Sequence, residues 1–76
     1  MRTVYHVTKT ENGWQGKRED RPMAAVKGAT KREVVAETIA AAKNHEPSSV
    51  RIHGVNGRIQ EERTYPRMSD PHGSRG

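Results

Sequence analysis

The sequence contains no cysteine and no phenylalanine, and aromatic residues make up only 4% of it. Without cysteine there is no disulfide and no thiolate chemistry, which excludes the disulfide-rich class of small secreted proteins and agrees with a reducing cytoplasm. No stretch approaches the roughly 20 apolar residues of a membrane span, and the first residues carry no apolar run typical of a signal peptide. We therefore expect a cytoplasmic protein with no membrane partner.

The low apolar content also limits the size of the core. The chain has 76 residues, of which 30% are hydrophobic, enough for one small domain with a thin core. Its aromatic residues are Tyr5, Trp14 and Tyr65, so each ring should be important for packing. A domain this small and polar is marginally stable alone, and homodimerisation through a sheet edge or face is an expected way to bury more surface.

The sequence contains two Asn-Gly dipeptides, Asn12-Gly13 and Asn56-Gly57. Asn-Gly tolerates positive φ at both central positions of a type I′ turn, and apolar residues flank each dipeptide, so two β-hairpins are predicted. Alternation of apolar and polar residues sets the strand limits. The expected strands are residues 3–8, 14–18, 50–54 and 58–61, with a short additional strand at 23–27.

Residues 30–44, between the hairpins, carry the signals of an amphipathic helix. Thr30 and Glu33 have the spacing of a capping box, and Asn44 is expected to end the helix in the left-handed conformation. An apolar stripe at i, i+3, i+4 and i+7 should pack on the sheet, with Val34 at its margin. This stripe consists of Val35, Thr38, Ile39 and Ala42.

These signals together predict an α+β domain over residues 1–65. Its order is β-β-α-β-β, with one amphipathic helix packed on a small, mainly antiparallel sheet. Residues 66–76 contain two prolines, two glycines and almost no apolar residue, and a flexible C-terminal tail is expected there.

The motifs resemble a bacterial family known as domain of unknown function 2188 (DUF2188). The most specific segment is residues 52–60 (IHGVNGRIQ), and His6-Val7, Gly13-Trp14, the helix start at Thr30 and the later Tyr65 add to it. The resemblance covers roughly residues 3–65. It implies a compact α+β domain with no assigned activity and no catalytic residues to transfer. One departure is Gly16, two positions after Trp14, where the family usually has an aliphatic residue.

Strand alternation predicts an apolar sheet face toward the helix and a polar, mostly basic face on the other side. The side chains expected to face the helix are Tyr5, Val7, Trp14, Val50, Ile52 and Ile59. The candidate binding face on the other side contains His6, Lys17, Arg51, His53, Arg58 and Gln60.

The basic face and the net charge of +5 suit contacts with nucleic-acid phosphates, but the face lacks the exposed aromatic residues on which single-strand binders stack bases. A solvated outer face is the ordinary alternative for an antiparallel sheet. His6 and His53 share the face, yet a zinc site needs at least a third protein ligand, so we expect ordinary hydrogen bonds from these histidines.

Enzyme motifs are missing as well. No G-x-S-x-G or H-E-x-x-H pattern occurs in the sequence. The prediction is a non-catalytic binding or interaction module with no cofactor, metal or small-molecule substrate. Self-association as a homodimer is the first expectation for its partner, and nucleic-acid binding through the basic face is the alternative.

Overall fold

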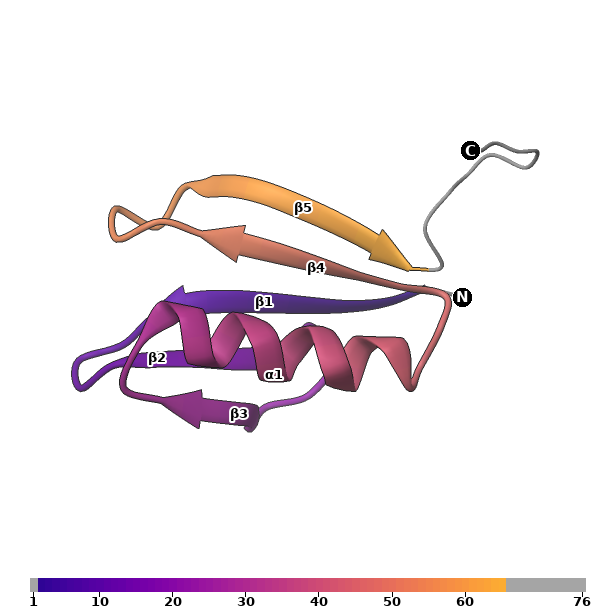
Figure 1. Ribbon diagram of the computed structural model, residues 1–76, viewed down its shortest axis with the longest axis horizontal. Helices are drawn as coiled ribbons and strands as arrows, with labels where there is room; N and C mark the ends of the chain where they lie inside the picture. The colour runs from indigo at the N-terminus through magenta and orange to yellow at the C-terminus, as the bar shows by residue number, and fades with distance from the viewer. Residues whose placement is uncertain (1, 66–76) are drawn as a thin grey trace.

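The computed structural model describes residues 2–65, which form a helix and a five-stranded sheet (Figure 1). The α+β class and the predicted order of hairpin, helix and hairpin are confirmed, and the short additional strand is also present. The predicted tail, residues 66–76, lies outside the described residues. The elements are β1 (Thr3–Lys9), β2 (Trp14–Arg18), β3 (Ala24–Gly28), α1 (Lys31–Lys43), β4 (Ser48–His53) and β5 (Ile59–Tyr65).

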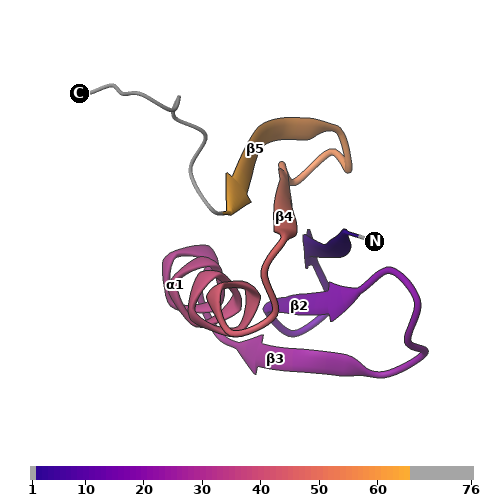
Figure 2. The same cartoon turned by 90° about the vertical axis from the view of Figure 1, so that its right-hand side faces the viewer.

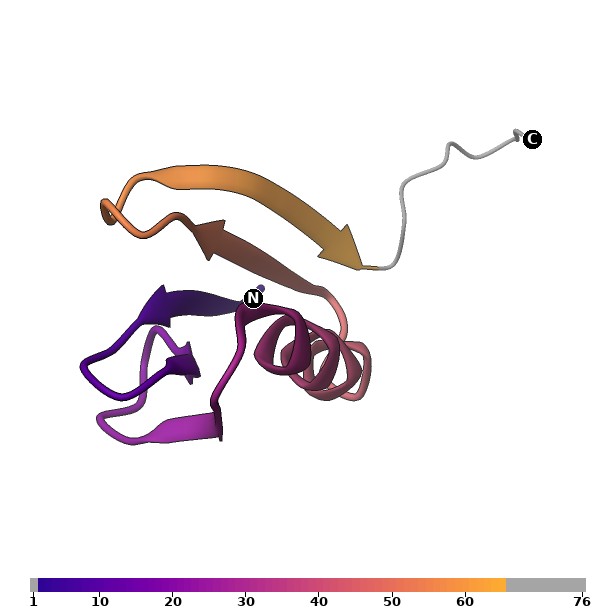
Figure 3. The same ribbon diagram turned by 60° about the vertical axis from the view of Figure 1, so that its left-hand side comes forward.

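The strand order is β3-β2-β1-β4-β5. The central strands β1 and β4 are parallel, and the other three pairings are antiparallel. A parallel pairing needs a crossover, and α1 lies in the connection between β3 and β4. The helix covers one face of the sheet, over β1 to β4, as the view along the helix shows (Figure 2). β5 forms the edge opposite β3 (Figure 3).

The core lies between α1 and the sheet, and most of its members are the predicted ones. Ile59 is the exception, because its side chain is 53% exposed. In the β4–β5 ladder, Ile52 lies opposite Glu61 and His53 lies opposite Ile59, so β5 has one extra residue, Gln60. Such a bulge reverses the alternation of side chains, and Ile59 shares the face of His53. The buried hydrophobic residues are Tyr5, Val7, Trp14, Val34, Ala42, Val50, Ile52 and Tyr65.

The buried stripe of α1 is rotated slightly from the predicted one. Val34, expected at the margin, is fully buried together with Thr38, whereas Val35 and Ile39 are half-buried. This rotation is explained by the sheet beneath the helix, because Val34 packs so closely on Gly28 that a Cβ there would come within 2.9 Å of Val34 Cγ2. The missing side chain lets α1 approach the sheet closely along this line.

The two ends of α1 agree with the sequence prediction to different degrees. The Thr30 hydroxyl accepts a hydrogen bond from the Glu33 amide at 3.2 Å, as expected of the N-cap. Asn44, predicted to be left-handed, has φ −83° and ψ −5°, which is right-handed. Its N–H donates to the Ala41 carbonyl at 3.1 Å. The last turn therefore tightens with an i to i−3 bond, and this needs no left-handed residue.

Neither Asn-Gly dipeptide forms the predicted two-residue type I′ loop. Gly57 N–H donates to the Gly54 carbonyl at 2.9 Å and Gly54 N–H to the Arg58 carbonyl at 2.8 Å, which defines a three-residue loop. Gly57 supplies its left-handed position, with φ +86°.

In the first hairpin, Thr10 N–H bonds to the Gly13 carbonyl at 2.8 Å, so Gly13 flanks the loop. A Cβ on Gly13 would lie 2.3 Å from the Gly28 carbonyl oxygen. The glycine is therefore required there by the close approach of the β3 backbone.

Candidate functional site

The outer face of the sheet, the side away from α1, carries a row of charged and titratable side chains across four strands. His6 on β1 lies in register with Lys17 on β2 and with Arg51 on β4. Arg51 in turn lies opposite Glu62 on β5. Of the six residues predicted for the binding face, the structure therefore brings His6, Lys17 and Arg51 into one row, with His53 beside them.

Gln60 and Arg58 do not join this row. The Gln60 side chain accepts a hydrogen bond from Lys31 Nζ of α1 at 3.0 Å, so Gln60 lies on the helix side of the sheet. The β5 bulge causes this change of face. Arg58 belongs to the loop before β5, where its N–H donates to Asn56 Oδ1 at 3.0 Å. The prediction that both residues follow the strand alternation is wrong.

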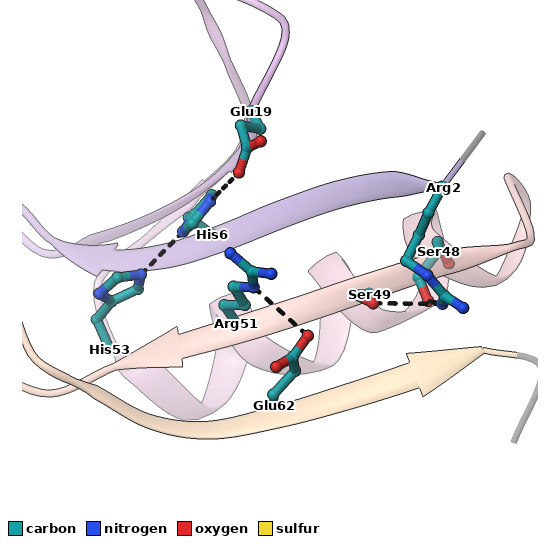
Figure 4. Close-up of polar contacts among 8 residues, drawn as sticks. All are labelled: Arg2, His6, Glu19, Ser48, Ser49, Arg51, His53 and Glu62. Carbon is teal, nitrogen blue, oxygen red and sulfur yellow. Dashed lines mark hydrogen bonds and ion pairs between the residues drawn. The ribbon is translucent and has the colours of Figure 1, made fainter. Parts of the chain in front are cut away.

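His6 and His53 are the centre of a hydrogen-bonded chain on the outer face (Figure 4). His6 Nδ1 and His53 Nε2 are 2.9 Å apart, and the ring centroids are 5.2 Å apart. At one end of the chain, His6 Nε2 lies 2.8 Å from Glu19 Oε1. At the other end, His53 Nδ1 lies 2.9 Å from the Gly57 carbonyl oxygen. The chain thus joins the residue after β2, strand β1, strand β4 and the β4–β5 loop.

Two carboxylates that the sequence analysis did not place on this face reduce its positive charge. Arg51 Nε lies 3.4 Å from Glu62 Oε2, and Glu19 contacts His6. Lys27 of β3 lies opposite Gln15 and also faces this side, so Glu19 and Glu62 offset two of the three strand-borne cations, which are Lys17, Lys27 and Arg51. Placing Glu62 on this face requires the register of β5, which depends on a bulge with no clear sequence signal. Strand alternation could not place Glu19, because it lies beyond the end of β2.

Arg2 closes the other end of the outer face. Its Nη1 donates to the Ser48 carbonyl at 3.0 Å and to Ser49 Oγ at 3.3 Å. Ser48 itself is buried on the helix side, where its hydroxyl donates to the Ala42 carbonyl at 2.7 Å. These contacts anchor the start of β4 to both layers of the domain, which indicates a structural role.

The second candidate surface consists of the outer edge of β5, with which no other strand of residues 2–65 pairs, and the groove between β5 and α1. Arg63 Nε bonds to Glu61 Oε2 at 2.7 Å along this strand, and this bond raises the pKa of the Arg63 guanidinium above its ordinary value. The groove has a volume of about 600 Å³. Its walls combine apolar and charged side chains: Lys31, Arg32, Val35, Ala36, Ile39, Ile52, Gln60, Glu61 and Arg63.

The described part of the chain holds no group of three or more His, Cys, Asp or Glu side chains that could bind a metal ion. Within residues 2–65, no helix is long and apolar enough to cross a membrane.

Residues 5–65 match the model of a family described as "Uncharacterized protein conserved in bacteria (DUF2188)". The chain belongs to this family. The DUF2188 match begins within β1, at residue 5, and ends at the last residue of β5, so it covers most of β1 and all of the helix and the other strands. It confirms the resemblance seen in the His53–Ile59 segment, and the family description assigns no activity. No curated protein and no solved structure matches this DUF2188 chain.

Proposed function

We propose that this protein is a cytoplasmic, non-catalytic interaction module that self-associates edge to edge through β5. The observation that carries the proposal is the open edge of this strand. β5 spans seven residues, contains no proline or glycine and, among residues 2–65, is the last strand in the sheet order. An edge strand of this kind presents unpaired backbone N–H and C=O groups to a second chain.

Charge complementarity selects one register for the pairing. A two-fold axis through Glu62 makes two copies of β5 antiparallel and places Glu61 opposite Arg63 of the second copy, twice. Opposite charges in cross-strand pairs favour this register. The two Glu62 side chains meet at the axis, where each is accompanied by Arg51 of its own chain.

The other edge of the sheet is less suited to pairing. β3 has five residues and begins two residues after Pro22. Its ladder with β2 is irregular between Gly16 and Lys17. β5 also has a bulge, at Gln60, and is followed in sequence by Pro66, so the difference between the two edges is their length. A short edge strand limits pairing with another chain.

Sedimentation equilibrium tests the proposal. The wild-type chain is expected to approach twice its monomer mass of 8.5 kDa as concentration rises. Glu61→Arg turns both intermolecular attractions into repulsions, and at about 0.2–1 kcal/mol for each cross-strand pair this should weaken dimerisation about tenfold. The charge-swapped double variant Glu61→Arg/Arg63→Glu should restore it.

The matched control is Glu37→Arg, a charge reversal at an exposed position on α1, which should leave the dimer unchanged. Circular dichroism of each variant separates loss of dimer from loss of fold. A wild-type chain that stays strictly monomeric at high concentration would overturn the proposal.

Nucleic-acid binding through the outer face has less support. Lys17 and Arg51 favour phosphate contacts, but Glu19 and Glu62 lie on the same face. Trp14, Tyr5 and Tyr65 are buried, so these aromatic rings are not available to stack on bases.

A further inference from the structure

The hydrogen-bonded chain through His6 and His53 determines where its protons lie. A carbonyl oxygen only accepts, so His53 Nδ1, 2.9 Å from the Gly57 carbonyl, must carry a hydrogen. An ionised carboxylate also only accepts, so His6 Nε2, 2.8 Å from Glu19, must carry one too. Both outer ring positions are therefore occupied.

The two inner nitrogens, His6 Nδ1 and His53 Nε2, face each other at 2.9 Å. In two neutral rings each of them holds a lone pair, and two lone pairs cannot form a hydrogen bond. In two charged rings each holds an N–H, and two donors cannot bond either. Only the pair that carries one extra proton forms N–H···N. If the Nε2 proton of His6 moves to Glu19, the chain of Glu19, His6 and His53 still needs the same total number of protons to form all of its hydrogen bonds.

We propose that His6 and His53 form a shared-proton site, which binds one proton between Nδ1 and Nε2 and thereby joins β1 to the β4–β5 loop. The Glu19 carboxylate balances the added charge. Because His53 also holds the Gly57 carbonyl, gain or loss of the shared proton acts on the loop that starts β5. The site lies within one chain and does not require the self-association proposed above.

The charged groups around the pair favour a proton over a metal ion. Lys17 on β2 and Arg51 on β4 flank His6, Glu62 on β5 lies 3.4 Å from Arg51, and Glu19 contacts His6 directly. α1 lies on the opposite face of the sheet. A divalent ion would bring two charges next to two cations and would need further ligands. A proton brings one charge, balanced by Glu19, and needs only two nitrogens.

A bell-shaped dependence on pH follows from this geometry. The hydrogen bond between His6 and His53 is absent when the pair has no extra proton and also when it has two. This hydrogen bond is therefore strongest at an intermediate pH. Imidazole changes charge between about pH 5 and 8, and two coupled groups lose their protons in two steps that belong to the pair.

Nitrogen-15 NMR of the histidine rings tests the proposal, from about pH 4 to about pH 9, a range that brackets histidine titration. At intermediate pH, His53 should be protonated at Nδ1 and His6 at Nε2, with the inner nitrogens sharing one proton. Both rings should titrate in the same two steps. His45, exposed at the end of α1 and outside this hydrogen-bonded chain, is the internal reference.

His53→Gln is the most informative variant, because the glutamine amide takes the place of Nε2 and can donate to His6 Nδ1 without an extra proton. The bell-shaped response of the loop signals should then disappear, while His45→Ala should leave it intact. Independent one-step titrations of His6 and His53 would overturn the proposal. A link that appears only with zinc and is lost with a chelator would also overturn it, in favour of a metal site.

Discussion

Thr38 on α1 lies directly over Gly16 on β2, so closely that a Cβ on Gly16 would come within 2.0 Å of Thr38 Oγ1. The glycine leaves the space that an aliphatic side chain would fill, and the helix occupies it with Thr38, which is fully buried. The low apolar content of this chain is thus offset locally by close contact between helix and sheet.

Gly16→Ala is expected to lower the free energy of unfolding by about 1–3 kcal/mol, because overpacking forces the helix or the strand to shift. Thr38→Ala in the same chain removes the colliding hydroxyl, so the double variant should recover most of the loss. Urea denaturation of the two single variants and the double variant measures the coupling. Additive effects would show that the two residues do not interact.

Thr38→Val is expected to raise the free energy of unfolding by about 1 kcal/mol. Thr38 Oγ1 is buried and has no hydrogen-bond partner among the described residues, and an unsatisfied polar group costs about 1–3 kcal/mol. Thr30→Val is a useful contrast, because it removes the N-cap hydroxyl and should be destabilising. Thermal denaturation followed by circular dichroism distinguishes the two, and a less stable Thr38→Val variant would contradict the expectation.

Gly57→Ala is expected to destabilise the fold by about 1 kcal/mol, because a left-handed conformation is unfavourable for alanine. No atom of residues 2–65 lies within 4 Å of a Cβ built on Gly57, so the expected loss of stability comes from the φ of +86°. Gly57→Asn should cost less, since asparagine tolerates this region. Chemical denaturation of the two variants is the measurement, and equal losses would argue against a backbone origin.

Asp20 and Arg18 give the domain a small acid-sensitive contact. Arg18 Nε and Nη2 each lie 3.1 Å from a carboxylate oxygen of Asp20, and this hydrogen bonding lowers the pKa of Asp20 below its usual value. A lowered folded-state pKa stabilises the fold above the unfolded pKa of about 3.9, and this contribution is lost as the pH falls through the folded value.

Arg18→Gln should therefore return the pKa of Asp20 toward its ordinary value. Carbon-detected NMR of the Asp20 carboxyl measures the change. Glu11→Gln, at an exposed position in the first loop, is the control and should leave the Asp20 titration unchanged. An unchanged titration in Arg18→Gln would show that the contact does not form in solution.

The outer face is expected to bind oligonucleotides only weakly, because Glu19 and Glu62 offset two of its three strand-borne cations, Lys17, Lys27 and Arg51. Fluorescence anisotropy with short single- and double-stranded DNA at low salt measures this, and added salt should abolish any binding. Tight binding that Arg51→Glu removes and that Glu37→Arg leaves intact would instead establish the nucleic-acid hypothesis.

The elements themselves could be read from local patterns in the sequence. The positions of the two turns, the strand alternation and the Thr30 cap depend on residues a few positions apart, and such interactions form the same way in most contexts. For the same reason the helix and strands β1 to β4 occur close to their expected limits, whereas β5, expected to end at residue 61, continues to Tyr65. The type I′ geometry predicted for the two Asn-Gly turns was nevertheless wrong. The predicted details failed where a longer-range contact intervened, as at Val34, which packs toward Gly28.

Only the tertiary structure decided which strands are neighbours and in what register. The parallel pairing of β1 with β4 brings His6 to His53 across 47 positions of sequence, and the bulge at Gln60 moves Ile59 to the outer face and Gln60 to the helix side. Pairing partners and bulges are chosen by packing of the whole sheet, and a shift of one residue exchanges the two faces. The residue types were therefore visible in the sequence, while the surface that they form together depended on the fold.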